Sequence, residues 1–209
     1  MLYWERVKKL SIGTIIFDLG GVMVWTRWPR LTEPLAELTG TTPDEVMKRI
    51  RTGNAYFPHM RGELDFSGFH KRLTDDLGVE LTPDELLELW NSILEPNEAI
   101  NPIVKQLKGR YRLAIGSNTD GAHFNRGQEI QPATLEFDDV LVSYELGVCK
   151  PDPEFFRRGL AKLGVEAEEC LFIDDLEDNI EAARSLGIAG IRFESAEQLE
   201  QELMGMGIL

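Results

Sequence analysis

One stretch near the amino terminus constrains what this chain of 209 residues can fold into. Residues 14–17, Thr-Ile-Ile-Phe, form an apolar run rich in β-branched side chains, which predicts a buried strand. The run ends on the carboxylate of Asp18, and Gly20 and Gly21 then let the backbone turn away. An acid at the carboxyl end of a buried parallel strand lies where open α/β sheets bind ligands. Asp18 is therefore a candidate functional residue, with a plain loop acid or helix cap as the alternative.

Strands and helices alternate in the second half of the chain. Apolar runs predict strands at 111–116, 140–143, 170–174 and 188–193, and helices lie between them. This alternation is typical of a doubly wound, Rossmann-like parallel sheet. From the first strand to about residue 95 the sequence predicts only helices, two of which begin at Thr-Pro caps. We therefore predict an α/β core made of residues 1–27 and 97–209, with an inserted helical cap of residues 28–96.

The charge of the chain limits its partners. Lys and Arg number 22 against 36 Asp and Glu, a formal net charge of −14. Nucleic acids and anionic membranes would repel such a chain, so we expect neither as a partner. The chain has two cysteines and no CxxC, its start lacks the apolar centre of a signal peptide, and no apolar run reaches membrane-spanning length. We expect a cytoplasmic protein.

Three further polar clusters follow the predicted strands. Ser117 and Asn118 place a hydroxyl and an amide beside a helix start, which suits an anion; a simple helix cap is the alternative. Lys150 can steady a phosphate or a carboxylate, unless it is only a solvated loop lysine. Asp174 and Asp175 would repel each other unless a cation or proton intervenes, and Mg²⁺ prefers such oxygen ligands. An acidic helix start is the alternative for this pair. Together the clusters favour phosphoryl transfer.

This set of motifs resembles, in order and spacing, the four motifs of the haloacid dehalogenase superfamily of hydrolases. The matching segments are Phe17-Asp18-Leu19-Gly20-Gly21-Val22, Ser117-Asn118, Lys150-Pro151 and Asp174-Asp175-x-x-x-Asn179. The helical insert between the first two motifs is similar to the helical cap of that superfamily. Further segments, such as Arg61-Gly62-Glu63-Leu64, resemble a subgroup related to glucose-1-phosphate phosphatase and to the phosphatase domain of epoxide hydrolase.

The resemblance implies a covalent mechanism on a small phosphorylated metabolite, with a sugar 1-phosphate as one candidate. Asp18 would attack phosphorus and become an aspartyl phosphate, which water hydrolyses. Mg²⁺ would be held by Asp18, the main-chain carbonyl of Gly20 and Asp175, with Asp174 beside them. The other expected roles are phosphoryl binding by Ser117 and the N–H of Asn118, charge compensation by Lys150, and support of the acidic loop by Asn179.

One departure from the superfamily pattern leaves alternatives open. Most of its phosphatases carry a second Asp two residues after the nucleophile, as general acid and base, and here that position is Gly20. Such proton transfer is typically worth about 10² to 10⁴ in rate. A metal-independent dehalogenase also lacks that Asp, but typically lacks the pair formed by Asp174 and Asp175 as well. A weakly active or non-catalytic regulatory protein is the third alternative.

Substrate specificity is expected from the loop after the nucleophile and from the cap. Trp25 and Arg27 are predicted substrate-binding residues, because an aromatic side chain beside an arginine suits a sugar or a second anionic group. Further candidates are Trp28, Asn54, Tyr56, Phe57 and His59. His123 is a candidate replacement proton donor, with a structural histidine as the favoured alternative.

Overall fold

A five-stranded parallel sheet forms the centre of the protein, which we describe from a computed structural model covering residues 12–209. The strand order is β5-β4-β1-β6-β7, with bounds Asp139–Val142, Arg112–Ser117, Thr14–Phe17, Cys170–Asp174 and Ala189–Arg192. Central β1 pairs in parallel with β4 and β6, so that Phe17 lies beside Ile115 and Ile173. The polar residues that follow these strands therefore meet at one edge of the sheet. The predicted α/β class is confirmed; residues 1–11 of the predicted core lie outside the described residues.

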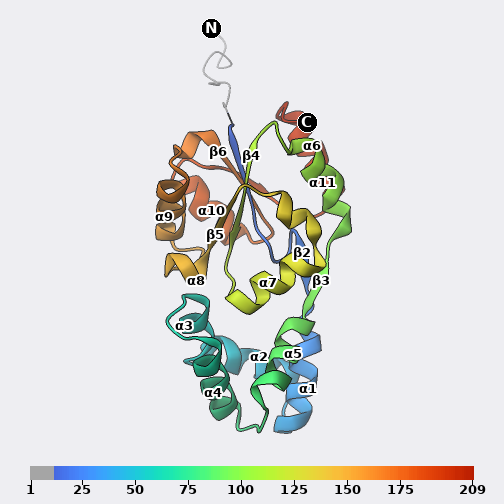
Figure 1. Cartoon of the computed structure of the whole chain (residues 1–209), viewed down its shortest axis with the longest axis vertical. Coiled ribbons are helices and arrows are strands. Elements are labelled where there is room, and N and C mark those ends of the chain that lie inside the picture. The colour runs from blue at the N-terminus through green and yellow to red at the C-terminus, as the bar shows by residue number, and fades with distance from the viewer. Residues whose placement is uncertain (1–11) are drawn as a thin grey trace.

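Helices cover both faces of the sheet (Figure 1). Side chains alternate along β1: Ile15 and Phe17 belong to one hydrophobic cluster and Ile16 to another. The first cluster includes side chains of α6 (Asn101–Leu107), α7 (Gly121–Ile130) and α11 (Ala196–Gly205). The second includes side chains of α9 (Pro153–Leu163) and α10 (Glu177–Ser185). The short 3₁₀ helices are η1 (Glu98–Ile100), η2 (Pro132–Glu136) and η3 (Ala167–Glu169).

The segment of residues 28–93 is mainly helical and lies at the lower end of the molecule in Figure 1. Its helices are α1 (Pro29–Thr39), α2 (Pro43–Thr52), α3 (Tyr56–Met60), α4 (Phe66–Leu77) and α5 (Pro83–Ser92). As expected from their Thr-Pro sequences, α2 and α5 are capped by Thr42 and Thr82, whose side chains accept hydrogen bonds from backbone N–H groups of the first turn. The helices share a hydrophobic cluster of their own, which includes Trp90. We use the word cap for residues 28–96, the range predicted from sequence.

Two short strands lie between the cap and the sheet. The sequence predicted only loops and helices there, so this part of the prediction was wrong. β2 (Val24–Thr26) and β3 (Leu94–Pro96) form an antiparallel pair in which Trp25 lies opposite Glu95. Each has only three residues, which is too short for an alternating apolar pattern to reveal it. The predicted strand at 140–143 is also one residue late, because Ser143 begins the short helix α8 (Ser143–Leu146).

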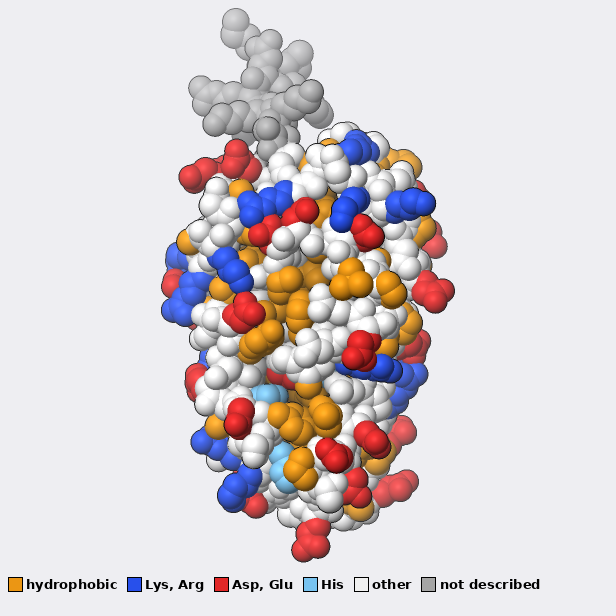
Figure 2. Space-filling model, in the orientation of Figure 1, with side chains coloured by type: hydrophobic (Ala, Val, Ile, Leu, Met, Phe, Trp, Pro, Cys, Tyr) orange, Lys and Arg blue, Asp and Glu red, His pale blue; other side chains and the backbone are white. Residues whose placement is uncertain are grey.

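The surface carries both signs of charge. Figure 2 shows acidic and basic side chains scattered over one face, with hydrophobic side chains gathered along its midline. Among residues 12–209, no helix combines the length and apolar character needed to cross a membrane.

Candidate active site

A cavity of about 370 Å³ lies where the ends of β1, β4 and β6 face the cap. Most of the residues predicted for the site line it, and they do so from four segments that are far apart in the sequence. The core side comprises Asp18, Gly20, Ser117, Asn118, Lys150, Asp175 and Asn179, and the cap side Trp28, Arg51, Tyr56 and Phe57. A polar floor thus faces a largely aromatic wall.

Asp18 lies at the carboxyl end of β1 with both carboxylate oxygens held in place. The N–H of Leu19 donates to Oδ1 at 2.7 Å, and the ammonium of Lys150 lies 3.0 Å from Oδ2. Burial raises the pKa of Asp18 well above its ordinary value; Lys150 opposes this rise, and the charges of Asp174 and Asp175 add to it. A cation near Asp18 would favour its ionised, nucleophilic form.

Lys150 is the cation at the floor of the cavity and is almost fully buried. Its ammonium contacts Asp174 at 2.6 Å and donates to the carbonyl of Gly116 at 2.8 Å, in addition to its contact with Asp18. Burial would lower the pKa of Lys150, but the charges of Asp174 and Asp18 outweigh it and raise the pKa above its ordinary value. Lys150 therefore carries a positive charge between the two carboxylates.

Asn118 positions Lys150 in a way that the sequence did not indicate. The Asn118 amide donates to the main-chain carbonyl of Lys150 at 2.8 Å and accepts from its N–H at 2.7 Å. The side-chain oxygen and nitrogen of Asn118 are thus both hydrogen-bonded to the main chain of Lys150. The predicted contact of Asn118 with an anion would therefore be made by its main-chain N–H. The hydroxyl of buried Ser117 lines the cavity beside it.

Asp174 and Asp175 are adjacent in sequence but differ in environment. Asp174 is fully buried, and both of its oxygens are engaged: Oδ2 by Lys150, and Oδ1 by the Leu176 N–H and the Asn179 amide, each at 2.9 Å. Burial would raise the pKa of Asp174, but Lys150 and these hydrogen bonds lower it. Asp175 lines the cavity, and both burial and Asp174 raise its pKa. Asp175 is thus the more available ligand, whereas Asp174 anchors Lys150.

The acidic groups of the floor fit a divalent cation. Oxygens of Asp18, Asp174 and Asp175 all lie within 4.8 Å of one another, and hard oxygen donors are the ligands of Mg²⁺. Three carboxylates face a single ammonium, which leaves uncompensated negative charge. Gly21 has φ of +82°, and a Cβ there would collide with the carboxylate of Asp175. Glycine at this position therefore allows the loop after β1 and the acidic loop after β6 to approach each other.

Two predicted substrate-binding residues lie elsewhere, and an arginine that lines the cavity was not predicted. The ring of Trp25 packs against Phe193, with centroids 6.3 Å apart, and Arg27 pairs with Glu95 at 3.2 Å. Neither lines the cavity, because the β2–β3 pairing directs both toward other partners. Arg51, near the end of α2, does line it. Only its position in the last turn of a predicted helix could have drawn attention to it, and Lys48 and Arg49 share that region.

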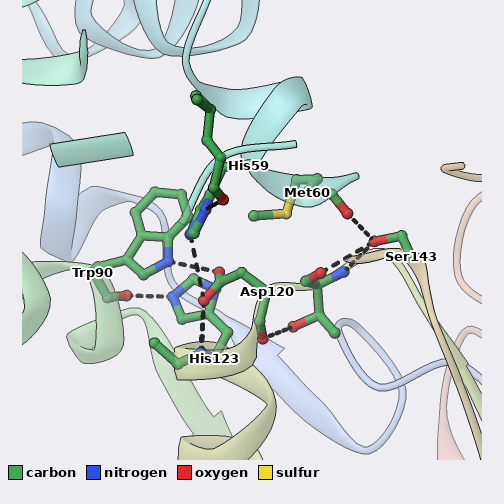
Figure 3. A network of polar contacts seen from close by, with 9 residues as sticks. His59, Met60, Trp90, Asp120, His123 and Ser143 are labelled. Atoms are coloured by element: carbon green, nitrogen blue, oxygen red, sulfur yellow. Dashed lines mark hydrogen bonds and ion pairs between the residues drawn. The ribbon is translucent and has the colours of Figure 1, made fainter. Parts of the chain in front are cut away.

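His59 and His123 belong to a separate polar network between cap and core (Figure 3). Asp120 accepts the indole N–H of Trp90 at 2.9 Å, and its oxygens lie 3.7 Å from His59 Nε2 and 3.5 Å from His123 Nδ1. The other ring nitrogen of His123 lies 2.6 Å from the carbonyl of Trp90. His123 is therefore engaged away from the cavity at the strand ends, as expected of a structural histidine. Nearby, the Ser143 hydroxyl lies 2.6 Å from the Met60 carbonyl, a second link between core and cap.

Comparison with known proteins agrees with this arrangement. The family model described as haloacid dehalogenase-like hydrolase matches residues 12–187. The D-ribitol-5-phosphate phosphatase of Bacteroides thetaiotaomicron is 27% identical, with 92% of this chain and 97% of that protein covered. Acyl-CoA dehydrogenase family member 10 of Mus musculus is 28% identical over 97% of this chain, which spans only 20% of that protein.

A solved structure gives the same picture of the fold. A HAD family enzyme from Bacteroides thetaiotaomicron, solved in complex with magnesium and inorganic phosphate, superposes with a TM-score of 0.78 at 22% identity. The match covers 88% of this chain and 95% of that chain. Since the family model covers most of the sequence, the chain belongs to the haloacid dehalogenase-like hydrolases.

Proposed function

We propose that the protein is a Mg²⁺-dependent phosphatase that hydrolyses a small phosphorylated metabolite through an aspartyl phosphate on Asp18. One observation carries the proposal: Asp18, Lys150 and Asp175 converge on a single cavity at the carboxyl edge of the sheet. The relative named D-ribitol-5-phosphate phosphatase and the related structure containing magnesium and phosphate support the same chemistry.

In the proposed reaction, an oxygen of Asp18 forms a bond to phosphorus while the bond to the leaving-group oxygen breaks. Lys150 and the N–H of Leu19 hold the carboxylate in one orientation, which favours attack on a positioned phosphate. Ser117 and the N–H of Asn118 would bind the phosphoryl oxygens. Water then attacks phosphorus, loses a proton, and restores the Asp18 carboxylate.

The metal would be held by Asp18, Asp175 and the main-chain carbonyl of Gly20, with Asp174 behind them. When bound, Mg²⁺ supplies positive charge to the phosphoryl oxygens and to the nucleophile. Asn179 keeps the acidic loop in place through Asp174. The position of Gly20 offers no side chain for proton transfer, so the leaving group takes its proton from water.

Hydrolysis of an aryl phosphate by the purified protein tests the proposal. We expect activity that requires Mg²⁺, is abolished by chelation and is lost in Asp18→Asn. Asp84→Asn makes the same substitution at an exposed position of α5. It serves as a control and should retain activity. Metal-independent release of halide from a 2-haloacid would instead support a dehalogenase, and activity retained by Asp18→Asn would exclude Asp18 as nucleophile.

A further inference from the structure

The cap side of the cavity presents one arginine, Arg51, on the second-to-last position of α2. Its neighbours on the helix, Lys48 and Arg49, both pair with Glu45. Within residues 12–209, no carboxylate lies within ion-pair distance of the Arg51 guanidinium. In a chain with 36 acidic side chains against 22 basic ones, an arginine without an acidic partner that faces a cavity points to an anionic ligand.

The Arg51 guanidinium is held against an aromatic wall. It lies over the ring of Trp28, with the central carbon 5.8 Å from the ring centroid. Trp28 in turn packs edge-on against Tyr56 and Trp90, at centroid distances of 6.4 and 6.2 Å. Stacking on Trp28 restricts the otherwise exposed Arg51 side chain, which lowers the entropy lost when the guanidinium binds a planar anion.

Tyr56 adds a hydrogen-bond donor next to Arg51. Burial raises the pKa of Tyr56 to about 12, even though Arg51 opposes the shift, so the hydroxyl stays protonated at neutral pH. Tyr56 lines the same cavity as Arg51. A guanidinium and a phenol hydroxyl that line the same cavity together offer the donors that the two oxygens of a carboxylate accept.

The charges on the two sides of the cavity indicate how a substrate would lie in it. The nucleophile and Lys150 are on the core side, whereas Arg51 is on the cap side. The exposed acid Asp178 also lines the cavity and would oppose a dianion. Arg51 is the one cation that the cap contributes to the lining, and Asp178 adds negative charge to the same cavity from the core helix α10, so the remote end suits a single negative charge and favours a carboxylate over a second phosphate.

We infer that Arg51 binds a carboxylate at the end of the substrate remote from the phosphate, which makes the substrates phosphomonoesters of small hydroxy acids. This inference rests on the proposed function and narrows it. Arg51 is then a specificity-determining residue that acts on substrate binding, while the core residues carry the chemistry.

Two series of alkyl phosphates test the inference, with two to five carbons and either a carboxylate or a hydroxymethyl group at the far end. We expect the wild-type protein to have a higher kcat/KM for a carboxylate ester than for its hydroxymethyl counterpart. In Arg51→Gln this preference should fall by about ten- to a hundredfold, mainly through KM, since a charged hydrogen-bonded pair is lost. Arg51→Lys should keep part of the preference. Arg49→Gln removes the same charge from the same helix outside the cavity and should leave the preference unchanged.

The outcomes separate the inference from the proposed function. If an aryl phosphate is hydrolysed but wild type and Arg51→Gln show the same ratio between the two series, the phosphatase stands and the role of Arg51 is refuted. If no phosphate ester is hydrolysed, the proposed function fails. Calorimetric titration of carboxyalkyl phosphates into Asp18→Asn, with and without Arg51→Gln, then decides: equal affinities overturn the inference, and weaker binding without the arginine supports it.

Discussion

Asp174 and Lys150 form a buried ion pair in which the ammonium nitrogen lies 2.6 Å from Oδ2. The second oxygen of Asp174 accepts hydrogen bonds from Leu176 and Asn179, so the carboxylate is fixed from both sides. Lys150 is held in turn by Asn118 through its main chain. Asp174 therefore acts through Lys150 as a positioning residue.

Replacing Asp174 with asparagine should therefore destabilise the protein and slow the reaction. We expect Asp174→Asn to lower the free energy of unfolding by about 3 kcal/mol, at the lower end for a broken buried pair because Lys150 keeps its contact with Asp18. Urea denaturation at pH 7 measures the change. In a double-mutant cycle with Lys150→Met, the two substitutions should be strongly non-additive. Additive effects would mean that the pair is not coupled.

Gly20 can accept a side chain, which allows the missing general acid to be introduced. Its backbone is not in the left-handed region, and an added Cβ would meet only Thr26 Cγ2, at 3.4 Å. We expect Gly20→Asp to fold and to hydrolyse alkyl phosphates at least about tenfold faster, a fraction of the 10² to 10⁴ that proton transfer can contribute. Rates measured over a series of leaving groups should depend less steeply on leaving-group pKa than in the wild-type protein.

Gly20→Asn provides the matched comparison for this experiment, because it adds the same shape without a transferable proton. An equal gain in both variants would assign the effect to packing. A wild-type rate that already shows no dependence on the leaving group would mean that another residue supplies the proton.

Gly21 should tolerate substitution far less well than its neighbour. In Gly21→Ala, the left-handed backbone costs about 1–2 kcal/mol, and the methyl group would press on the carboxylate of Asp175. We expect a loss of stability and a higher Mg²⁺ concentration for half-maximal activity. Gly40→Ala shares the left-handed backbone but meets nothing within 4 Å, so it should lower stability without changing the Mg²⁺ requirement. The same Mg²⁺ requirement in both variants would argue against the contact with Asp175.

The sequence indicated which residues meet at the floor of the cavity because most of their side chains directly follow an apolar strand. The run that ends at Asp18 and the run that ends at Asp174 are buried in the centre of a parallel sheet, and such strands are visible as continuous apolar segments. Parallel pairing then brings the strand ends to one edge, whatever lies between them in sequence.

The wall of the cavity was predicted in part, because helix packing decides which cap residues face the core: the candidates Trp28, Tyr56 and Phe57 line it, and Asn54 and His59 do not. Trp25 and Arg27 follow the nucleophile loop closely, yet the pairing of β2 with β3 gives Arg27 a carboxylate partner in Glu95. Arg51 reaches the cavity from α2, although it comes more than thirty residues after Asp18 in the sequence. No local pattern distinguishes it from Arg49.

Asp120 gives the contact between cap and core a dependence on pH. Burial would raise the pKa of Asp120, but His59, His123 and Trp90 outweigh it and hold the pKa well below its ordinary value. Burial lowers the pKa of His59, but the attraction of Asp120 is stronger and raises the pKa above its ordinary 6.5. In the folded protein His59 therefore binds a proton more tightly than in the unfolded chain.

The stabilisation from protonated His59 should therefore be complete below about pH 6.5 and be lost as pH rises through the higher pKa of the folded protein. We expect His59→Gln to lower the free energy of unfolding more at pH 5.5 than at pH 8.5, by urea denaturation at both values. The low pKa of Asp120 acts in the opposite direction, since its contribution is present above about pH 4 and is lost in stronger acid. In an Asp120→Asn background the larger effect of His59→Gln at pH 5.5 should disappear or reverse, because burial, which lowers the pKa of His59, is no longer opposed by Asp120. A larger effect at pH 5.5 that persists in that background would assign the pH dependence to another group.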